Sequence, residues 1–189
     1  MAGKFILVVG PSGSGKSVLL AHLRDKRPDI LFPRSCTTRA IRPGEVAGEA
    51  YRFLTPEEFD EYTKNGDFLE WATYGGNRYG TLRSDILPTI EAGGVAVKEV
   101  EVQGARQIKE LIPKDQLGII FIDAGTWEEL KARILARAPI GEAELTARHK
   151  RYDDERTFMG EVTHVVKNFD GDLERAKEDF LAAVSQLTK

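Results

Sequence analysis

Gly10-Pro11-Ser12-Gly13-Ser14-Gly15-Lys16-Ser17 decides the fold, because it fits the pattern G-x-x-x-x-G-K-[ST] in the context that gives the pattern its meaning. The apolar run 5–9 before it is typical of a buried parallel strand, and residues 18–23 after it continue as a helix. The glycines let backbone N–H groups turn toward phosphate oxygens, with the helix dipole behind them. A glycine-rich turn that binds nothing is the alternative, and the flanking strand and helix argue against it.

This phosphate-binding loop predicts contacts to a nucleotide and its metal. Lys16 is expected to reach the β- and γ-phosphates, and Ser17 to offer its hydroxyl to Mg²⁺. The residues expected to contact the nucleotide in this loop are Gly10, Ser12, Gly13, Ser14, Gly15, Lys16 and Ser17.

Composition limits the partners that the chain can have. The 189 residues are 41% hydrophobic, enough for one α/β domain with additions. The net charge of −3 gives no general attraction to nucleic acid or to an anionic membrane. Cys36, the single cysteine, has no partner for an intramolecular disulfide and suits a reducing compartment. With neither a bilayer-length apolar run nor a signal-peptide pattern, we expect a cytoplasmic protein. We also expect a monomer or a simple homo-oligomer.

Strand-like and helical patterns alternate, which predicts an α/β fold with a mostly parallel five-stranded sheet and helices on both faces. The five strands are expected at residues 31–36 and 95–102 and at 5–9, 118–122 and 164–167. An insert should contain a helix at 56–65, a strand at 68–74 and a helix at 83–92. Further helices are expected at 103–111 and 126–138, then up to about 158, and from about 172.

Arg39 and Arg42 lie three apart in a predicted loop. Their forked guanidinium groups could clamp a second, smaller anion, which a phosphate-binding loop alone does not require. A solvated basic turn is the ordinary alternative for two arginines, and the tyrosines downstream weigh against it.

Together these motifs resemble the guanylate kinases, P-loop nucleoside monophosphate kinases that transfer the γ-phosphoryl group of ATP to GMP. The resemblance covers nearly the whole chain. Besides the loop it rests on residues 35–39 with Arg42, and on 48–53, 68–71, 76–81 and 99–105. It implies a P-loop NTPase fold with a core (1–34, 91–137 and 151–189), a GMP-binding insert (35–90) and a helical lid (138–150). It also implies Mg²⁺ as cofactor, ADP and GDP as products, and a place in purine nucleotide metabolism.

The resemblance assigns two groups of residues to GMP. Those implied to hold its phosphate are Arg39, Arg42, Tyr51 and Tyr79. Those implied to face its base are Ser35, Glu70, Thr81 and Glu101. Guanine presents N1–H and the 2-amino group as adjacent donors, which suit a carboxylate acceptor, and adenine lacks this pair. A buried carboxylate facing adenine would lose its partners. Taken alone, Glu70 would be interpreted first as an exposed strand residue.

Two carboxylates compete for the metal side. Glu99 and Glu101 are expected on one face of the strand 95–102, at the end where α/β proteins bind ligands, although the family more commonly has aspartates there. An edge strand with a solvated acidic face is the alternative. Asp123 ends a second apolar strand, but it could instead satisfy backbone donors before Thr126. We expect Glu99 to act on Mg²⁺ through a bridging water.

Three arginines point to a lid over ATP. Arg133 and Arg137 are four apart on one helix, and Arg148 returns from the next, after the break at Pro139. The resemblance implies that Arg133 and Arg137 bind ATP, and that Arg137 and Arg148 act in catalysis with Lys16 and Arg39. Arginines on helices are more usually solvated charges. Residues 138–141 also depart from the family's acidic lid tip.

Two other functions share parts of this pattern. A ribose 1,5-bisphosphate phosphokinase has the same loop and fold, but no reason to keep a guanine-facing carboxylate with paired arginines and tyrosines. A guanylate-kinase-like scaffold domain binds phosphoproteins and generally loses the loop lysine, which this chain retains as Lys16.

Overall fold

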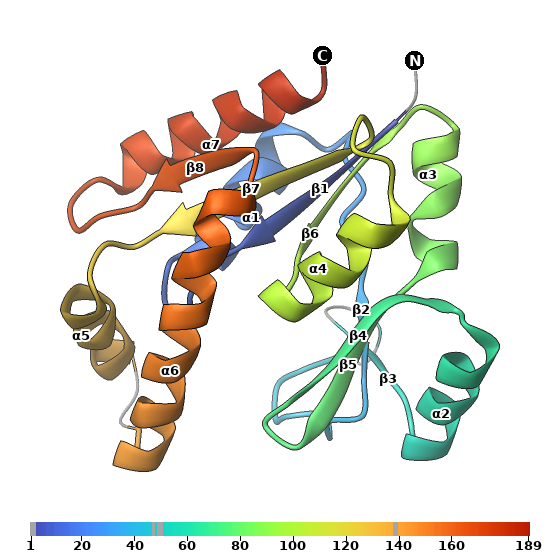
Figure 1. The fold of residues 1–189 in the computed structure, drawn as a ribbon, viewed down its shortest axis with the longest axis horizontal. Helices are drawn as coiled ribbons and strands as arrows, with labels where there is room; N and C mark the ends of the chain where they lie inside the picture. The colour runs from blue at the N-terminus through green and yellow to red at the C-terminus, as the bar shows by residue number, and fades with distance from the viewer. Residues whose placement is uncertain (1–2, 47, 49–50, 138–139) are drawn as a thin grey trace. The chain divides into compact units, whose positions relative to one another are not determined.

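The computed structural model describes residues 3–46, 48, 51–137 and 140–189 (Figure 1). They divide into two compact units, which we describe separately. Unit 1 comprises residues 1–5, 30–98 and 103–117, and unit 2 comprises residues 6–29, 99–102 and 118–189. Among the described residues, no helix has both the length and the apolar character needed to cross a bilayer.

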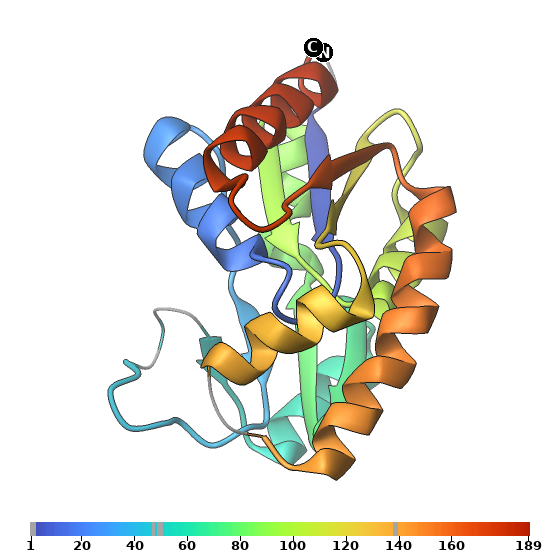
Figure 2. The same ribbon diagram turned by 90° about the vertical axis from the view of Figure 1, so that its left-hand side faces the viewer.

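The larger sheet follows the strand order β6-β1-β7-β8. Its strands are β1 (Lys4–Val9), β6 (Val95–Glu99), β7 (Leu117–Asp123) and β8 (His164–Lys167). The inner residues of β1 and β7 are buried, as expected for continuous apolar runs covered on both faces. In unit 2, α1 (Lys16–Lys26) and α7 (Leu173–Leu187) pack against each other, and α7 packs against β8 (Figure 2).

The strand predicted at residues 31–36 is wrong, because these residues do not form one continuous strand of the larger sheet. Leu31 forms only an isolated parallel bridge with Ala96. Its N–H donates to the Val95 carbonyl and its carbonyl accepts from Val97 N–H, both at 2.9 Å. Pro33 has no N–H to continue the ladder. The sheet therefore has four strands among the described residues, and the chain runs on into β2 (Ser35–Thr37) of the second sheet.

The predicted strand 95–102 is also too long. β6 ends at Glu99, and α4 (Val102–Leu111) begins three residues later. Val100 and Val102 are both buried, so their alternation looks like a strand although the helix has already started. Strand alternation therefore does not place Glu99 and Glu101 on one face, which corrects that expectation.

The second sheet belongs to unit 1 and has the order β3-β2-β5-β4. It adds β3 (Tyr51–Phe53), β4 (Phe68–Tyr74) and β5 (Asn77–Leu82) to β2. β4 matches the predicted strand, whereas β5 and the three-residue β3 were not predicted. β2 and β3 are parallel, and β5 is antiparallel to both of its neighbours.

One helix of unit 1 was predicted closely and another was not. α2 (Pro56–Asn65) has the predicted capping box: Glu58 N–H donates to the Thr55 hydroxyl, and Thr55 N–H donates to the Glu58 carboxylate. Phe59 on α2 packs on Cys36, Phe68 and Leu82. The predicted helix 83–92 is instead a 3₁₀ turn, η1 (Arg83–Asp85), followed by the short α3 (Leu87–Glu91).

The remaining elements of unit 2 are helical. They are α5 (Trp127–Arg137), α6 (Glu142–Phe158) and the 3₁₀ turn η2 (Met159–Glu161). Tyr152 of α6 packs with Leu130 and Ile134 of α5 and with Ala124. Positions 138–139, where the predicted lid begins, lie outside the described residues.

Candidate active site

The loop between β1 and α1 has a backbone that only glycine permits. Gly10, Gly13 and Gly15 have φ angles of 140°, 90° and 91°. A Cβ at Gly10 would lie 2.6 Å from the Ile122 carbonyl oxygen, and one at Gly15 would lie 2.2 Å from Asn168 Nδ2. The loop is therefore fitted against β7 and against the residue that follows β8.

Lys16, the first residue of α1, folds its side chain back over this loop. Its ammonium donates to the carbonyls of Gly10 at 2.6 Å and Pro11 at 3.0 Å. The Glu99 carboxylate lies 3.5 Å from the same ammonium. Lys16 is only 9% exposed, so its charge is held at one place above the loop. The neighbouring Ser17 is exposed in the first turn of α1.

The two candidate metal-side carboxylates have different partners. Glu99 is exposed at the end of β6 and forms the ion pair with Lys16. Asp123 at the end of β7 accepts a 3.0 Å hydrogen bond from Gly125 N–H, and its Oδ1 lies 3.6 Å from Arg156. Asp123 therefore holds the turn before α5.

The predicted lid arginines make several contacts within unit 2. Arg148 on α6 donates to the Ser12 hydroxyl at 2.6 Å and pairs with Glu144 at 2.6 Å. Arg133 on α5 donates to Asp170 at 2.6 Å and to the Asn168 carbonyl at 2.8 Å. Arg137 is the last residue of α5, and its side chain lies outside the described part of the structure.

The predicted phosphate arginines lie in the loop of unit 1 that follows β2. Both oxygens of Glu45 accept hydrogen bonds from Arg39 Nη2, at 2.8 and 3.0 Å. The same carboxylate accepts from the backbone N–H of Arg42 at 2.8 Å. The hydrogen bond to Arg39 lowers the pKa of Glu45, and Glu45 in turn raises that of Arg39. This loop thus already surrounds an anionic group.

The predicted tyrosines lie close to that loop. Tyr51 and Tyr79 come from different strands, and their ring centroids are 6.0 Å apart. The guanidinium carbon of Arg39 lies 5.3 Å from the Tyr51 ring centroid. The structure thus brings two phenol rings and an arginine together.

The base-facing group is only partly assembled within unit 1. Thr81 is fully buried and donates to Glu70 Oε1 at 2.5 Å. Ser35 Oγ accepts a 2.8 Å hydrogen bond from Lys98. Glu101 belongs to unit 2 and is exposed.

A model of the guanylate kinase family matches residues 2–186. The chain belongs to the guanylate kinase family. The guanylate kinase of Streptomyces coelicolor is 42% identical over 71% of this chain and 67% of the relative. That of Rubrobacter xylanophilus is 38% identical over 98% of this chain and 95% of the relative. A crystal structure of guanylate kinase from Anaplasma phagocytophilum superposes with a TM-score of 0.74, with 26% identity, 98% coverage of this chain and 86% coverage of the other.

Guanylate kinases are ATP-dependent nucleoside monophosphate kinases. Two buried polar residues near the phosphate-binding loop, Asn168 and Glu155, were not among the predicted site residues. Asn168, directly after β8, is 5% exposed. Its Nδ2 donates to the Ser14 carbonyl at 2.8 Å, and its N–H donates to the Asp123 carbonyl at 2.8 Å. It therefore supports the phosphate-binding loop from the side. Its position after the terminal strand, where α/β proteins place ligand-binding residues, is the sequence signal for this role.

Glu155 of α6 is the other residue, and sequence reasoning missed it. It is 8% exposed and lies on the buried face of α6, together with Tyr152 and Phe158. Burial, and next the carboxylate of Glu101, raise the pKa of Glu155 to about 7, while the Lys16 ammonium acts in the opposite direction. The spacing of three residues along α6 is the signal that could have revealed a glutamate on an apolar face.

Proposed function

We propose that this guanylate kinase transfers the γ-phosphoryl group of ATP to GMP, giving ADP and GDP, with Mg²⁺ as cofactor. The observation that carries this proposal is the Lys16 ammonium, held by the carbonyls of Gly10 and Pro11 over a glycine loop. A cation fixed there meets the negative charge of the β- and γ-phosphates, which is the main requirement of phosphoryl transfer.

On the donor side, we propose that the backbone N–H groups of the loop and the exposed Ser17 receive the phosphates of ATP. Arg148 supports a role near the phosphates because it already reaches the Ser12 hydroxyl. We propose that Arg137 and Arg148 balance charge on the migrating group, and that Arg133 binds ATP. The ATP-contacting residues proposed within the loop are Gly10, Ser12, Gly13, Ser14, Gly15, Lys16 and Ser17.

On the acceptor side, we propose that Arg39, Arg42, Tyr51 and Tyr79 bind the phosphate of GMP. The Glu45 carboxylate supports this role, because it occupies the arginine loop as an anion would. GMP phosphate must then compete with Glu45 for the guanidinium of Arg39. The residues proposed to face guanine are Ser35, Glu70, Thr81 and Glu101.

The oxygen ligands that unit 2 offers, the Ser17 hydroxyl and the Glu99 carboxylate, suit Mg²⁺ better than a metal that must be coordinated by protein side chains alone. Among the described residues, no group of three or more His, Cys, Asp or Glu side chains could hold a metal ion. Mg²⁺ typically uses one or two carboxylates together with waters and substrate phosphates. The Ser17 hydroxyl and, through water, the Glu99 carboxylate are the oxygen donors proposed to hold it. When bound, Mg²⁺ neutralises phosphate charge.

We further propose that residues 35–90 act as the GMP-binding insert, residues 138–150 as a lid, and the rest as the core. We also propose that the enzyme works in the cytoplasm, as a monomer or a simple homo-oligomer, without nucleic acid. The buried thiol of Cys36, whose pKa is raised chiefly by desolvation, is compatible with a reducing compartment.

ADP release over a panel of acceptors tests this function. We expect GMP to be phosphorylated and AMP, CMP, UMP and ribose 1,5-bisphosphate to be poor acceptors. Lys16→Met should lower turnover with GMP by about a thousandfold or more, because it removes the cation at the transferring phosphate. The circular dichroism spectrum should stay unchanged. Near-normal turnover in a folded Lys16→Met protein would refute the proposal, and equal use of AMP and GMP would refute the base-facing assignment.

A further inference from the structure

We propose that Gly104 and Gln107 of α4 are positioning residues for Glu70, and that they thereby set the preference of the enzyme for guanine. This inference rests on the proposed function. Neither residue needs to touch the substrate for this role. Both act on the carboxylate through contacts that lie entirely within unit 1.

Glu70 is confined on both sides of its carboxylate. It lies in β4 with 8% exposure, and its Oε1 accepts the 2.5 Å hydrogen bond from Thr81 on the neighbouring strand. Its Oε2 faces the first turn of α4, because a Cβ built on Gly104 would lie 2.5 Å from that oxygen. The carboxylate can therefore occupy its present position only while residue 104 has no side chain.

Gly104 is the third residue of α4, in its first turn. Glycine is the weakest helix former apart from proline, so its place in this first turn calls for a reason. The chain does not adopt a left-handed conformation at Gly104, since its φ is not positive. The close approach to Glu70 supplies the reason, because alanine at this place would displace the carboxylate.

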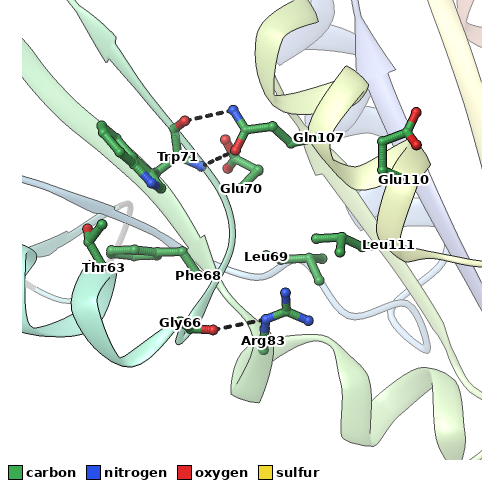
Figure 3. Close-up of a pocket in the computed structure, with 10 residues that line it drawn as sticks. All are labelled: Thr63, Gly66, Phe68, Leu69, Glu70, Trp71, Arg83, Gln107, Glu110 and Leu111. Atoms are coloured by element: carbon green, nitrogen blue, oxygen red, sulfur yellow. Dashed lines mark hydrogen bonds between the residues drawn. The ribbon is translucent and has the colours of Figure 1, made fainter.

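Gln107 holds the backbone on which Glu70 stands. Its Nε2 donates to the Trp71 carbonyl at 2.9 Å, and its Oε1 accepts from Trp71 N–H at 3.2 Å (Figure 3). β4 is the outer strand of its sheet, so these two backbone groups have no neighbouring strand to bond with in that direction. One amide side chain thus takes the place of a strand partner at the residue after Glu70.

The same side chains border a pocket of about 400 Å³ in unit 1, which is lined by Trp71, Gln107 and Leu111 among others (Figure 3). Trp71 is 39% exposed and Leu111 is 46% exposed. Side chains therefore pack loosely around this part of β4 and restrain its backbone only weakly. The two hydrogen bonds of the Gln107 amide restrain the backbone at Trp71 in a defined direction.

A correctly placed Glu70 would recognise the 2-amino group of guanine, which hypoxanthine lacks. The ratio of kcat/KM for GMP to kcat/KM for IMP therefore reports the position of the Glu70 carboxylate. Contacts to the phosphate do not change this ratio, because the two nucleotides share the same phosphate group. A displaced carboxylate should raise KM for GMP and leave kcat at saturation nearly unchanged, because the reacting phosphoryl groups are not altered.

Gly104→Ala is the decisive variant. The new Cβ would collide with Glu70 Oε2, which is the far end of a flexible side chain. The Glu70 carboxylate should therefore move aside, and α4 should stay intact. We expect KM for GMP to rise, and the GMP-to-IMP ratio to fall, by about tenfold, the effect of one misplaced hydrogen-bonding group. KM for ATP should not change, and the thermal midpoint should stay equal or rise. Gly160→Ala is the matched control, since nothing lies within 4 Å of a Cβ at Gly160.

Two further variants keep the inference testable. Gln107→Met keeps the length of the side chain and removes both hydrogen bonds, so it should lower the GMP-to-IMP ratio in the same direction. Glu70→Asp withdraws the carboxylate by one methylene, so Glu70→Asp combined with Gly104→Ala should lose less than the product of the two single effects.

The outcomes separate this inference from the proposed function. If the wild-type enzyme does not phosphorylate GMP, the proposed function has failed. If it does, and the folded Gly104→Ala protein keeps the wild-type ratio within twofold, the positioning role is wrong. A thermal midpoint for Gly104→Ala clearly below that of Gly160→Ala would also overturn it, because the helix would then have yielded. Independent effects of Glu70→Asp and Gly104→Ala would exclude the contact between them.

Discussion

The environments of Glu99 and Asp123 predict different effects of neutralising each carboxylate. Glu99 is exposed and pairs with the Lys16 ammonium, whereas Asp123 accepts a hydrogen bond from Gly125 N–H. We expect Glu99→Gln to lower turnover at least tenfold and to raise the Mg²⁺ concentration needed for half-maximal rate, because an anionic oxygen beside the metal is lost.

Asp123→Asn is the matched comparison for Glu99→Gln. It should lower the free energy of unfolding by at most about 1 kcal/mol, because the amide oxygen can still accept from Gly125 N–H and only the charge facing Arg156 is lost. It should leave the magnesium titration close to that of the wild type. Urea unfolding and magnesium titration of both variants check these expectations. If Asp123→Asn shifted the magnesium titration and Glu99→Gln did not, Asp123 would be the metal-side acid.

Residue-level prediction succeeded where a motif fixes both residue type and backbone. The loop from Gly10 to Ser17 has the strand-to-helix setting that its sequence predicted, and the structure adds that its three glycines have positive φ. The assigned roles of its side chains stay predictions. Glu155 was missed because glutamates are mostly exposed, although its spacing of three residues from Tyr152 and Phe158 places it on their apolar face.

At the level of elements, the capping box of α2 predicts a measurable loss of stability. Thr55→Ala removes the hydroxyl that accepts from Glu58 N–H, so we expect the free energy of unfolding to fall by about 1 kcal/mol. Urea denaturation followed by circular dichroism measures the change. Ser185→Ala on the exposed face of α7 is the control, and its effect should stay within about 0.5 kcal/mol. Equal effects of the two substitutions would mean that the capping box does not stabilise α2.

The elements that sequence predicted well have strong local signals. α2 has a capping box and a proline at its first turn, and β7 is a continuous apolar run. The strand predicted at 31–36 failed because Leu31 and the residues after Pro33 pair with different sheets, a long-range choice that local pattern does not encode. β5 was missed because Gly80, which makes room for the Phe68 ring, reads locally as a turn residue.

For the whole molecule, the buried Glu155 predicts a stability that falls as pH rises. Its pKa is raised to about 7 in the folded state from an ordinary value of 4.5. The folded protein therefore keeps a proton that the unfolded chain releases, so the free energy of unfolding decreases between these two pH values. The contribution is on the order of 3 kcal/mol, which is present below pH 4.5 and lost as pH rises through 7.

Glu155→Gln, a neutral residue of the same shape, should remove this part of the pH dependence. Urea unfolding at pH 5 and pH 8 should show the variant similar to wild type at the lower pH and more stable at the higher one. The groups that face Glu155 are Glu101, Lys16, Arg151 and Asp154, and all remain in the variant. Glu178→Gln on the exposed part of α7 controls for the change in net charge. Parallel pH profiles of wild type and Glu155→Gln would contradict the prediction.

The short bridge at Leu31 also has a consequence for self-association. β6 is the outer strand of its sheet, and among the described residues Leu31 alone bridges to its free side. Lys98 lies in β6 with 5% exposure, and its ammonium donates to the Pro33 carbonyl at 3.2 Å and to Ser35 Oγ at 2.8 Å. The lysine thus ties the crossing segment over a strand edge that could otherwise pair with the same edge of another molecule. We therefore expect this buried ammonium, unfavourable for the strand alone, to hinder edge-to-edge pairing of β6 between molecules.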